Sequence, residues 1–328
     1  MTQTEPPKVD ITAKRGNGAG TDVGFRALAF VSGGLVLAIL GLIAVTTVTE
    51  ALPAFREAGA SFVTSSRWAP NNPDNPVFGT FSFVYGTLVT SFIALLVAVP
   101  VSIGIALFLT ELAPRRIRTA AITVIDLLAA IPSVVFGLVG ALVVAPFLVP
   151  MYAWLHETFG SWPVLGSVFG PPSATGYAFL TAGMILAFMV IPIITSISRE
   201  VFDTVPLADK QAAYALGATR WEMIKGAVFP HSFGGLVGAT MLGLGRAMGE
   251  TIAVALVIGS ATQVGANMLA PGNTMAAVIV QQWGEAGTLT KSALIGIGVV
   301  LFVMTIVVNY TARTIVRRAE VRMRGAHA

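Results

Sequence analysis

The chain has 328 residues, of which 55% are hydrophobic and only 11% are charged, and its formal net charge is +4. An ordinary soluble domain carries roughly a quarter charged residues, so this composition excludes a water-soluble enzyme unless the apolar residues are scattered. They instead gather in runs of about twenty or more residues, which are long enough to cross a bilayer. We therefore expect an integral membrane protein. The chain has no cysteine, which excludes a disulfide framework and a thiolate metal site.

Six apolar runs in chain order predict an all-α protein with six transmembrane helices. A polar, glycine-rich segment over 1–24 precedes them and is expected to be a flexible cytoplasmic tail. The first run is too long for the apolar core of a cleavable signal peptide, so we expect it to stay in the membrane. The predicted spans are about 26–48, 81–110, 120–149, 177–198, 234–260 and 292–312, within a membrane domain over 25–313, and a basic cytoplasmic tail over 314–328 follows them.

The basic residues predict the orientation of these spans. If six spans alternate from an inner N-terminus, 16 of the 20 Lys and Arg residues fall on the same side of the membrane. Basic residues collect on the cytoplasmic side of membrane proteins, so both termini are expected to be cytoplasmic. The same distribution makes these residues determinants of topology next to the lipid bilayer, and we expect no nucleic-acid binding.

The longest predicted cytoplasmic loop, 199–233, has the pattern of two short helices. An Ala-rich run that begins at Leu207 ends at Gly217, a residue type that favours a helix C-terminus. Thr219 and Glu222 then fit the capping box that begins a second helix. Such a hairpin is either a structured connector or a docking element, and the pattern alone does not separate the two.

The spacing within this loop resembles the EAA loop of ABC importer permeases. The matching residues are Gln211-Ala212-Ala213, Gly217 and Phe229-Pro230, with Gln211 in place of the usual Glu, Ala227 in place of an aliphatic residue and Phe229 in place of Leu. In that family the loop forms a coupling helix that sits in a groove of a cytoplasmic ATPase subunit. The resemblance therefore implies that Gln211, Ala212, Ala213 and Gly217 couple this chain to an ATPase.

Four further segments resemble the PstC family of phosphate importer permeases. They are Asn75-Pro76-Val77-Phe78-Gly79, Tyr85-Gly86-Thr87-Leu88, Ala130-Ile131-Pro132-Ser133-Val134-Val135 and Gly243-Leu244-Gly245-Arg246-Ala247-Met248-Gly249-Glu250-Thr251. The resemblance implies the MetI-like fold of type I ABC importer permeases and a multi-pass location in a bacterial inner (plasma) membrane. It also implies a complex with a second, PstA-like permease, a dimer of a PstB-like ATPase that carries ATP and Mg²⁺, and an extracytoplasmic PstS-like phosphate-binding protein.

Arg246 and Glu250 are the main candidates for the substrate pathway. Both lie about midway along the fifth span, where a charge is costly unless it faces protein or water, and their spacing places them on one helix face within pairing distance. A guanidinium offers an oxyanion several fixed donors and a permanent charge. Gly245 and Gly249 beside them allow a neighbouring helix to approach closely. The pair either lines an anion path, which the PstC-like motif favours, or only joins helices as a salt bridge.

Two weaker pathway candidates lie in the third span. Asp126, near its inner end, either lines the cytoplasmic exit or serves as a snorkelling or capping residue. Ser133, beside Pro132, either satisfies a backbone carbonyl that the proline frees or faces the path.

Motifs of catalysis are missing from the sequence. It has no Gly-x-x-x-x-Gly-Lys-Ser/Thr loop, no Ser/His/Asp set and no metal-ligand cluster, so we expect no catalytic residue, no metal and no cofactor on this chain, and ATP hydrolysis on a separate subunit. The predicted function is that of a permease subunit forming half of the translocation path of an ATP-driven inorganic phosphate importer. Two alternatives stay open: a permease for another oxyanion such as sulfate or molybdate, and an ion-coupled secondary carrier, against which the EAA-like loop argues.

Overall fold

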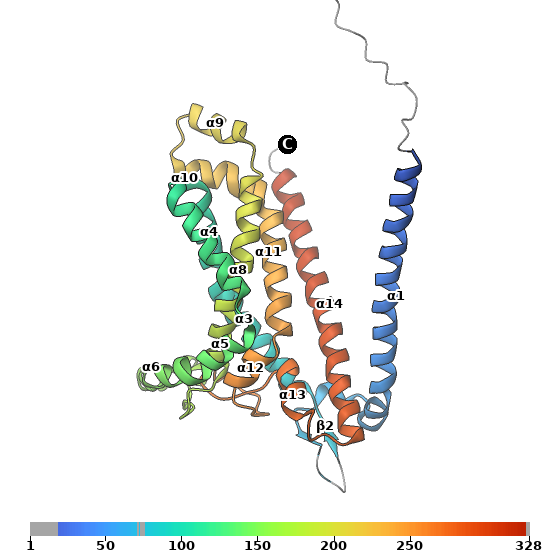
Figure 1. Cartoon of the computed structure of the whole chain (residues 1–328). Helices are drawn as coiled ribbons and strands as arrows, with labels where there is room; N and C mark the ends of the chain where they lie inside the picture. Colours follow the sequence, from blue (N-terminus) through green and yellow to red (C-terminus); the bar gives the residue numbers. More distant parts are fainter. Residues whose placement is uncertain (1–18, 71, 73–75, 326–328) are drawn as a thin grey trace, which may run out of the picture. The chain divides into compact units, whose positions relative to one another are not determined.

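The computed structural model describes residues 19–70, 72 and 76–325 (Figure 1). The chain divides into two compact units, Met1–Thr49 and Glu50–Ala328, and each is described by itself. Most of the predicted N-terminal tail, residues 1–18, lies outside the described residues, and a helix begins at Ala19. The predicted basic tail over 314–328 is helical as far as Gly325.

The described residues are mostly helical. Helix α1 (Ala19–Ala58) runs from the first unit into the second. The second unit holds the other elements: α2 (Ser61–Thr64), β1 (Trp68–Ala69), β2 (Val77–Phe78), α3 (Phe81–Leu107), the π-helical turn η1 (Phe108–Leu112), α4 (Arg115–Ala130), α5 (Ser133–Val139), the π-helical turn η2 (Gly140–Val144), α6 (Ala145–Phe159), α7 (Leu165–Val168), α8 (Phe179–Asp203), α9 (Leu207–Ala215), α10 (Arg220–Met223), the π-helical turn η3 (Ile224–Val228), α11 (Phe229–Gly249), α12 (Ile252–Val257), α13 (Met275–Gln282) and α14 (Thr288–Gly325).

Six helical stretches within the described part of the chain are long and apolar enough to cross a membrane. They are Asp22–Ala58, Phe81–Leu112, Ser133–Phe159, Phe179–Asp203, Arg220–Gly249 and Thr288–Thr314. They confirm the predicted helical fold with six spans. Strands β1 and β2 add one small antiparallel hairpin, in which Trp68 lies opposite Phe78.

The two ends of the second unit carry different elements (Figure 1). Helices α9 and α10 lie at one end, here called the α9 end, together with the start of α4 and the C-terminal end of α14. The β-hairpin and α13 lie at the opposite end, here called the hairpin end. The chain reaches the α9 end along α3, α8 and α14 and returns from it along α4–α5 and α11–α12, so these segments alternate in direction as predicted.

The centre of the second unit is built on α3, α8 and α11. Gly183 of α8 lies so close to α3 that a Cβ there would be 2.5 Å from the Cγ2 atom of Ile93. Gly243 of α11 lies as close to Val190 and Ile194 of α8. Small residues let helix axes approach in this way, and buried aliphatic side chains from these helices form the main hydrophobic cluster. This packing supplies a rigid frame for two helix breaks.

The first break interrupts the predicted third span, 120–149, which is therefore not one helix. Helix α4 ends at Ala130, Ile131 is extended with φ −66° and ψ 128°, and α5 begins after Pro132. A proline disfavours a helical conformation at the residue before it and has no N–H to donate to a helix bond. Figure 1 shows α4 and α5 following one another along α8, with which both are in contact, whereas α6 turns aside at the hairpin end.

The second break interrupts the predicted fifth span, 234–260, and the expectation of a continuous helix there is also wrong. Helix α11 ends at Gly249, and Glu250 is extended with φ −69° and ψ 130° before the short α12 begins. Gly259 and Ser260 then take positive φ values of 94° and 59°. They start a turn that leads back to α13.

Helix α13 lies in a segment that the sequence predicts to be an outer loop. Its first four residues, Met275 to Val278, are buried. Its N-terminal amides are satisfied by two hydroxyls, because Ala277 N–H donates to Thr274 Oγ1 at 3.3 Å and Met275 N–H donates to Thr87 Oγ1 of α3 at 3.0 Å. The helix has 8 residues, too few for a membrane span, so a search for long apolar runs passes over it.

Candidate translocation site and coupling loop

Arg246 and Glu250 lie at the break between α11 and α12. Arg246 is in the last turn of α11, where a positive charge suits the helix dipole. Its Nη2 atom lies 3.9 Å from Glu250 Oε2, and Glu250 Oε1 accepts a hydrogen bond from the Ala253 N–H at 3.4 Å. The predicted pair is therefore formed at a helix break and not along a continuous helix, and Glu250 also accepts a hydrogen bond from an amide in the first turn of α12.

The two side chains differ in their exposure. The Arg246 side chain is 47% exposed, whereas that of Glu250 is 7% exposed. Gly243, one turn before Arg246, packs against Val190 and Ile194 in the middle of α8, so the arginine lies at the depth of the membrane interior. An arginine there is costly if it faces lipid. Its exposed side therefore needs protein or water beside it.

Helices α5 and α12 pack in parallel with almost no space between them. A Cβ on Gly137 would lie 2.8 Å from Ala253 Cα, and a Cβ on Gly140 would lie 2.8 Å from Val257 Cγ1. Because the two contacts follow in the same order along both helices, the start of α5 lies level with the start of α12. The two helix breaks are therefore at the same depth.

Ser133, the first residue of α5, is placed by this register at the level of the α11–α12 break. Its side chain is partly buried and makes no hydrogen bond to any residue that the structure describes. The sequence predicts two alternative roles for Ser133, and the first is a hydrogen bond to a backbone carbonyl that Pro132 frees. No such bond is formed among the described residues.

Asp126 lies on the exposed surface of α4, a helix with no buried residue. It is about 16 Å along the helix from Arg115, given a rise of about 1.5 Å per residue, and so lies nearer to the Pro132 break than to the α9 end. Within the described ranges Asp126 has no hydrogen bond or ion pair. Arg118, the nearest basic residue in the sequence, pairs with Asp203 of α8 instead.

The close helix approach predicted at Gly245 and Gly249 is not made by any residue that the structure describes. A Cβ on either residue would meet no atom within 4 Å, and the tight contact of α11 is made at Gly243. One side of α11 is thus open next to the half-exposed Arg246.

Gly217 ends α9, as the sequence predicts. It has a φ of +81°, a conformation that favours glycine. Its N–H donates to the Tyr214 carbonyl at 3.0 Å, and the Ala218 N–H donates to the Ala213 carbonyl at 3.1 Å. These two bonds make the Schellman arrangement that satisfies the last carbonyls of a helix.

The predicted capping box begins α10. Glu222 N–H donates to Thr219 Oγ1 at 3.4 Å, and Thr219 N–H donates to Glu222 Oε2 at 2.8 Å. The chain continues through η3 into α11, where Phe229 packs edge-on against Phe202 of α8 with 6.1 Å between ring centroids. Both helix ends of the loop are therefore fixed by local bonds, so the loop has a defined shape.

The surface of this loop is partly apolar. Gln211 and Ala212 are exposed, whereas Ala213 packs against the hydrophobic cluster at the α9 end. Four large side chains of the loop are exposed: Leu207 at 67%, Tyr214 at 45%, Leu216 at 89% and Trp221 at 63%. Contiguous apolar surface outside a membrane typically marks an interaction site.

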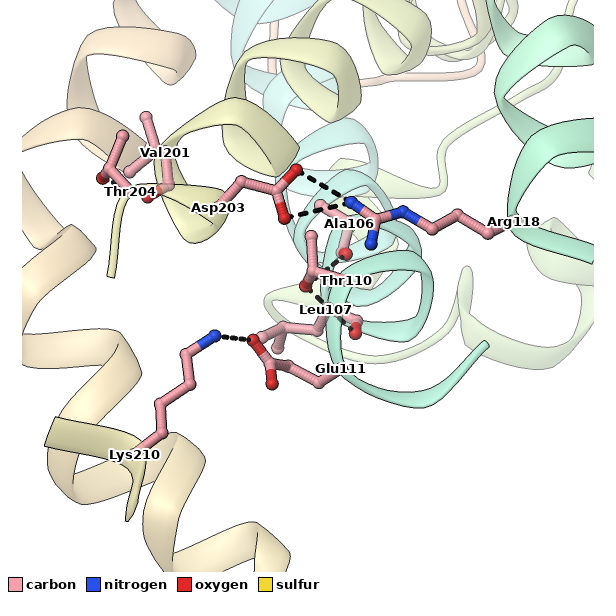
Figure 2. Close-up of polar contacts among 9 residues, drawn as sticks. All are labelled: Ala106, Leu107, Thr110, Glu111, Arg118, Val201, Asp203, Thr204 and Lys210. Carbon is pink, nitrogen blue, oxygen red and sulfur yellow. Dashed lines mark hydrogen bonds and ion pairs between the residues drawn. The ribbon is translucent and has the colours of Figure 1, made fainter. Parts of the chain in front are cut away.

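Two ion pairs join the loop region to the rest of the α9 end (Figure 2). Lys210 Nζ of α9 donates to Glu111 Oε1 of η1 at 2.5 Å, with side chains only 17% and 9% exposed. One guanidinium nitrogen of Arg118 donates to both carboxylate oxygens of Asp203 at 3.0 and 2.9 Å, with side chains 34% and 48% exposed. Sequence reasoning missed both pairs, because their members are far apart in the chain.

Two of the remaining PstC-like segments position the backbone. Tyr85 Oη donates to the Gly265 carbonyl at 2.8 Å, and a Cβ on Gly86 would lie 1.9 Å from the Asn273 carbonyl oxygen. A Cβ on Gly79 would lie 2.5 Å from a backbone oxygen of the loop before β1. Asn75, which begins the first segment, lies outside the described residues. These residues hold the hairpin end together.

The arrangement at the two breaks is suited to reversible anion binding. Arg246 keeps donors free because its pair with Glu250 is long, and the nearby carboxylate offsets part of the attraction for an anion. Among the residues that the structure describes, no group of three or more His, Cys, Asp or Glu is placed to hold a metal ion. The Arg246 guanidinium is the group of this site that is suited to electrostatic binding of an anion.

The comparisons with known proteins show the family of the chain. A family model described as "Binding-protein-dependent transport system inner membrane component" matches residues 98–325. The phosphate transport system permease protein PstC of Xylella fastidiosa is 42% identical over 97% of this chain and 98% of its own length, and PstC of Mesorhizobium japonicum is 42% identical over 92% of each. A chain of a bacterial alginate ABC transporter shares the fold, with a TM-score of 0.58, 18% identity and coverage of 91% of this chain and 98% of its own. The chain therefore belongs to the binding-protein-dependent transport system inner membrane components, multi-pass permeases that are not ATPases, and among them to the PstC permease family.

Proposed function

We propose that the chain carries inorganic phosphate across the membrane as half of the path of an ATP-driven importer. The half-exposed Arg246 at the α11–α12 break carries this proposal, because a guanidinium binds phosphate oxygens through several fixed donors. The Glu250 carboxylate beside it weakens the attraction between Arg246 and the anion, so that the anion can be released again. Other oxyanions suit the same arginine, and the similarity to PstC permeases supports phosphate.

A second, PstA-like permease supplies the other wall of the path. The open side of α11 at Gly245 and Gly249 and the exposed surface of α4 around Asp126 have no cover among the described residues of the second unit. We place Asp126 and Ser133 on the wall of the path, since the former has an unpaired charge at membrane depth and the latter lies level with Arg246.

A PstB-like ATPase dimer, which binds ATP and Mg²⁺, docks on the loop around α9. Gln211 and Ala212 present the EAA-like segment outward, and the exposed Leu216 and Trp221 offer apolar surface for the contact. The α9 end and both termini are then cytoplasmic, and a PstS-like binding protein delivers phosphate to the hairpin end. Closure of the ATPase dimer moves the loop and switches the access of the path.

The test is phosphate uptake by the assembled complex in proteoliposomes, with the binding protein and with ATP and Mg²⁺ on the ATPase side. Arg246→Gln removes the charge at the break, and Arg116→Gln removes one from the exposed start of α4 as a matched control. Subunit composition and ATP hydrolysis are measured for each complex.

ATP-dependent uptake that is lost in Arg246→Gln and kept in Arg116→Gln supports the proposal. Uptake of sulfate in place of phosphate by the wild type contradicts the cargo. Uptake without ATP contradicts the importer. Normal uptake by Arg246→Gln would show that the Arg246–Glu250 pair is only a structural salt bridge.

A further inference from the structure

We infer that the Glu111–Lys210 ion pair is the link that makes α9 and the end of α3 move as one body, so that displacement of α9 reaches the core of the permease. The inference rests on the proposed docking of an ATPase at α9. Both residues are positioning residues, since neither lies near the Arg246–Glu250 break.

Besides the ion pair, helix α9 contacts α10 and η3, which follow it in the chain. It is 9 residues long and has no buried residue, and its capping bonds at Gly217 are internal to the loop. Ala213 contributes one partly buried methyl group to the cluster at the α9 end. Lys210 lies one turn before Ala213 and adds a charged contact on the same side. An exposed short helix is marginal alone, so its position depends on such contacts.

The pair is more shielded from water than the Arg118–Asp203 pair beside it in Figure 2. Glu111 is 9% and Lys210 is 17% exposed, so the charges interact through a medium of low dielectric constant. The Arg118–Asp203 pair, at 34% and 48% exposed, is of the surface kind that contributes little. We therefore expect a displacement of Lys210 to move Glu111 more directly than a displacement of Arg118 moves Asp203.

Glu111 is placed to pass a displacement to the centre of the molecule. It lies in η1, which continues α3 without interruption, and Thr110 Oγ1 of the same turn donates to the Ala106 carbonyl at 3.0 Å. Helix α3 then packs along α8, where Gly183 meets Ile93. The path from α9 to the main hydrophobic cluster thus runs through the partly buried Glu111–Lys210 pair, then through η1 and α3.

The experiment uses the full chain in nanodiscs and the assembled complex in proteoliposomes. The variants are Glu111→Gln, the exchanged pair Glu111→Lys with Lys210→Glu, and Arg118→Gln as the matched control. The native chain has no cysteine, so spin labels on Leu112→Cys and Tyr214→Cys, both exposed, report the distance between η1 and α9 in the full chain. The complex reports phosphate taken up per ATP hydrolysed.

We expect one narrow label distance in the parent chain and in Arg118→Gln, a broad distribution in Glu111→Gln, and recovery of the narrow one in the exchanged pair. Uptake per ATP should fall about tenfold in Glu111→Gln, within the range of allosteric coupling factors, with ATP hydrolysis retained, and should recover in the exchanged pair. An unchanged distance distribution or an unchanged uptake ratio in Glu111→Gln, or no recovery in the exchanged pair, overturns the inference. A wild-type complex without ATP-dependent uptake overturns the proposed function instead, and the label distances still decide whether the pair holds α9.

Discussion

Gly137 of α5 meets Ala253 of α12 so closely that a Cβ on Gly137 would lie 2.8 Å from the Ala253 Cα atom. This contact aligns the two helix breaks, and the backbone cannot move aside as the tip of a side chain can. We expect Gly137→Val to lower the free energy of unfolding by about 3 kcal/mol, the upper part of the range for overpacking. Thermal unfolding in detergent measures the change. Gly245→Val is the control, since no atom lies within 4 Å of a Cβ there, and equal melting of both variants contradicts the packing of α5 on α12.

Glu250 has two separable roles, as a cap and as a charge. Glu250→Gln keeps an oxygen for the Ala253 N–H, which Glu250 Oε1 accepts at 3.4 Å, but removes the charge beside Arg246. We expect this variant to fold normally, to show a lower KM for phosphate and to have a lower maximal uptake rate, because an arginine without its carboxylate holds an anion longer. Glu250→Ala should also lose about 1 kcal/mol of stability with the cap. A higher KM in Glu250→Gln, measured in proteoliposomes, would contradict this assignment.

The sequence predicts the number and type of the spans, the Gly217 helix end and the Thr219–Glu222 capping box, because each depends on hydropathy or on neighbours in the chain. It also brings Arg246 and Glu250 together by their spacing. The sequence does not predict the break at Glu250, because no proline marks that position and the packing of α12 on α5 holds the extended backbone. The sequence also does not predict the Glu111–Lys210 pair, because only the packing of α3 and α8 brings these two residues together.

The wall of the proposed path can be mapped by thiol chemistry in a chain that has no native cysteine. Methanethiosulfonates react with the thiolate, which forms in water and not in lipid. We expect Ser133→Cys and Asp126→Cys to react in the assembled complex and phosphate to slow the reaction. Leu142→Cys, at an apolar position of η2 that is 73% exposed, should stay unreactive as a lipid-facing control. Reaction at Ser133 but not at Asp126 would assign Asp126 to snorkelling or capping.

Gly217 fixes the end of α9 through its φ of +81°. A residue with a Cβ is strained there by about 1–2 kcal/mol, so Gly217→Ala should fray α9. Hydrogen exchange on the α9 amides should speed up about tenfold, since about 1.4 kcal/mol of local stability corresponds to that factor. Gly226→Ala is a matched control, because Gly226 has no positive φ and an added Cβ meets no atom within 4 Å. Equal exchange rates in the two variants would show that contacts with other elements, and not the Gly217 helix end, stabilise α9.

Thr87 links α3 to the helix that the sequence does not predict. Its hydroxyl accepts the Met275 N–H at 3.0 Å and donates to the Phe83 carbonyl at 2.8 Å, and both bonds are buried. Thr87→Val keeps the shape of the side chain but leaves the Met275 amide without an acceptor, so we expect a loss of about 1–3 kcal/mol in the free energy of unfolding. Thr87→Ser keeps the hydroxyl and should recover most of that loss. Thermal unfolding of the two variants separates the hydrogen bond from the packing, because Thr87→Val loses only the hydroxyl and Thr87→Ser loses only the methyl group. A Thr87→Val variant that melts with the parent chain would contradict a stabilising role of the Met275 hydrogen bond.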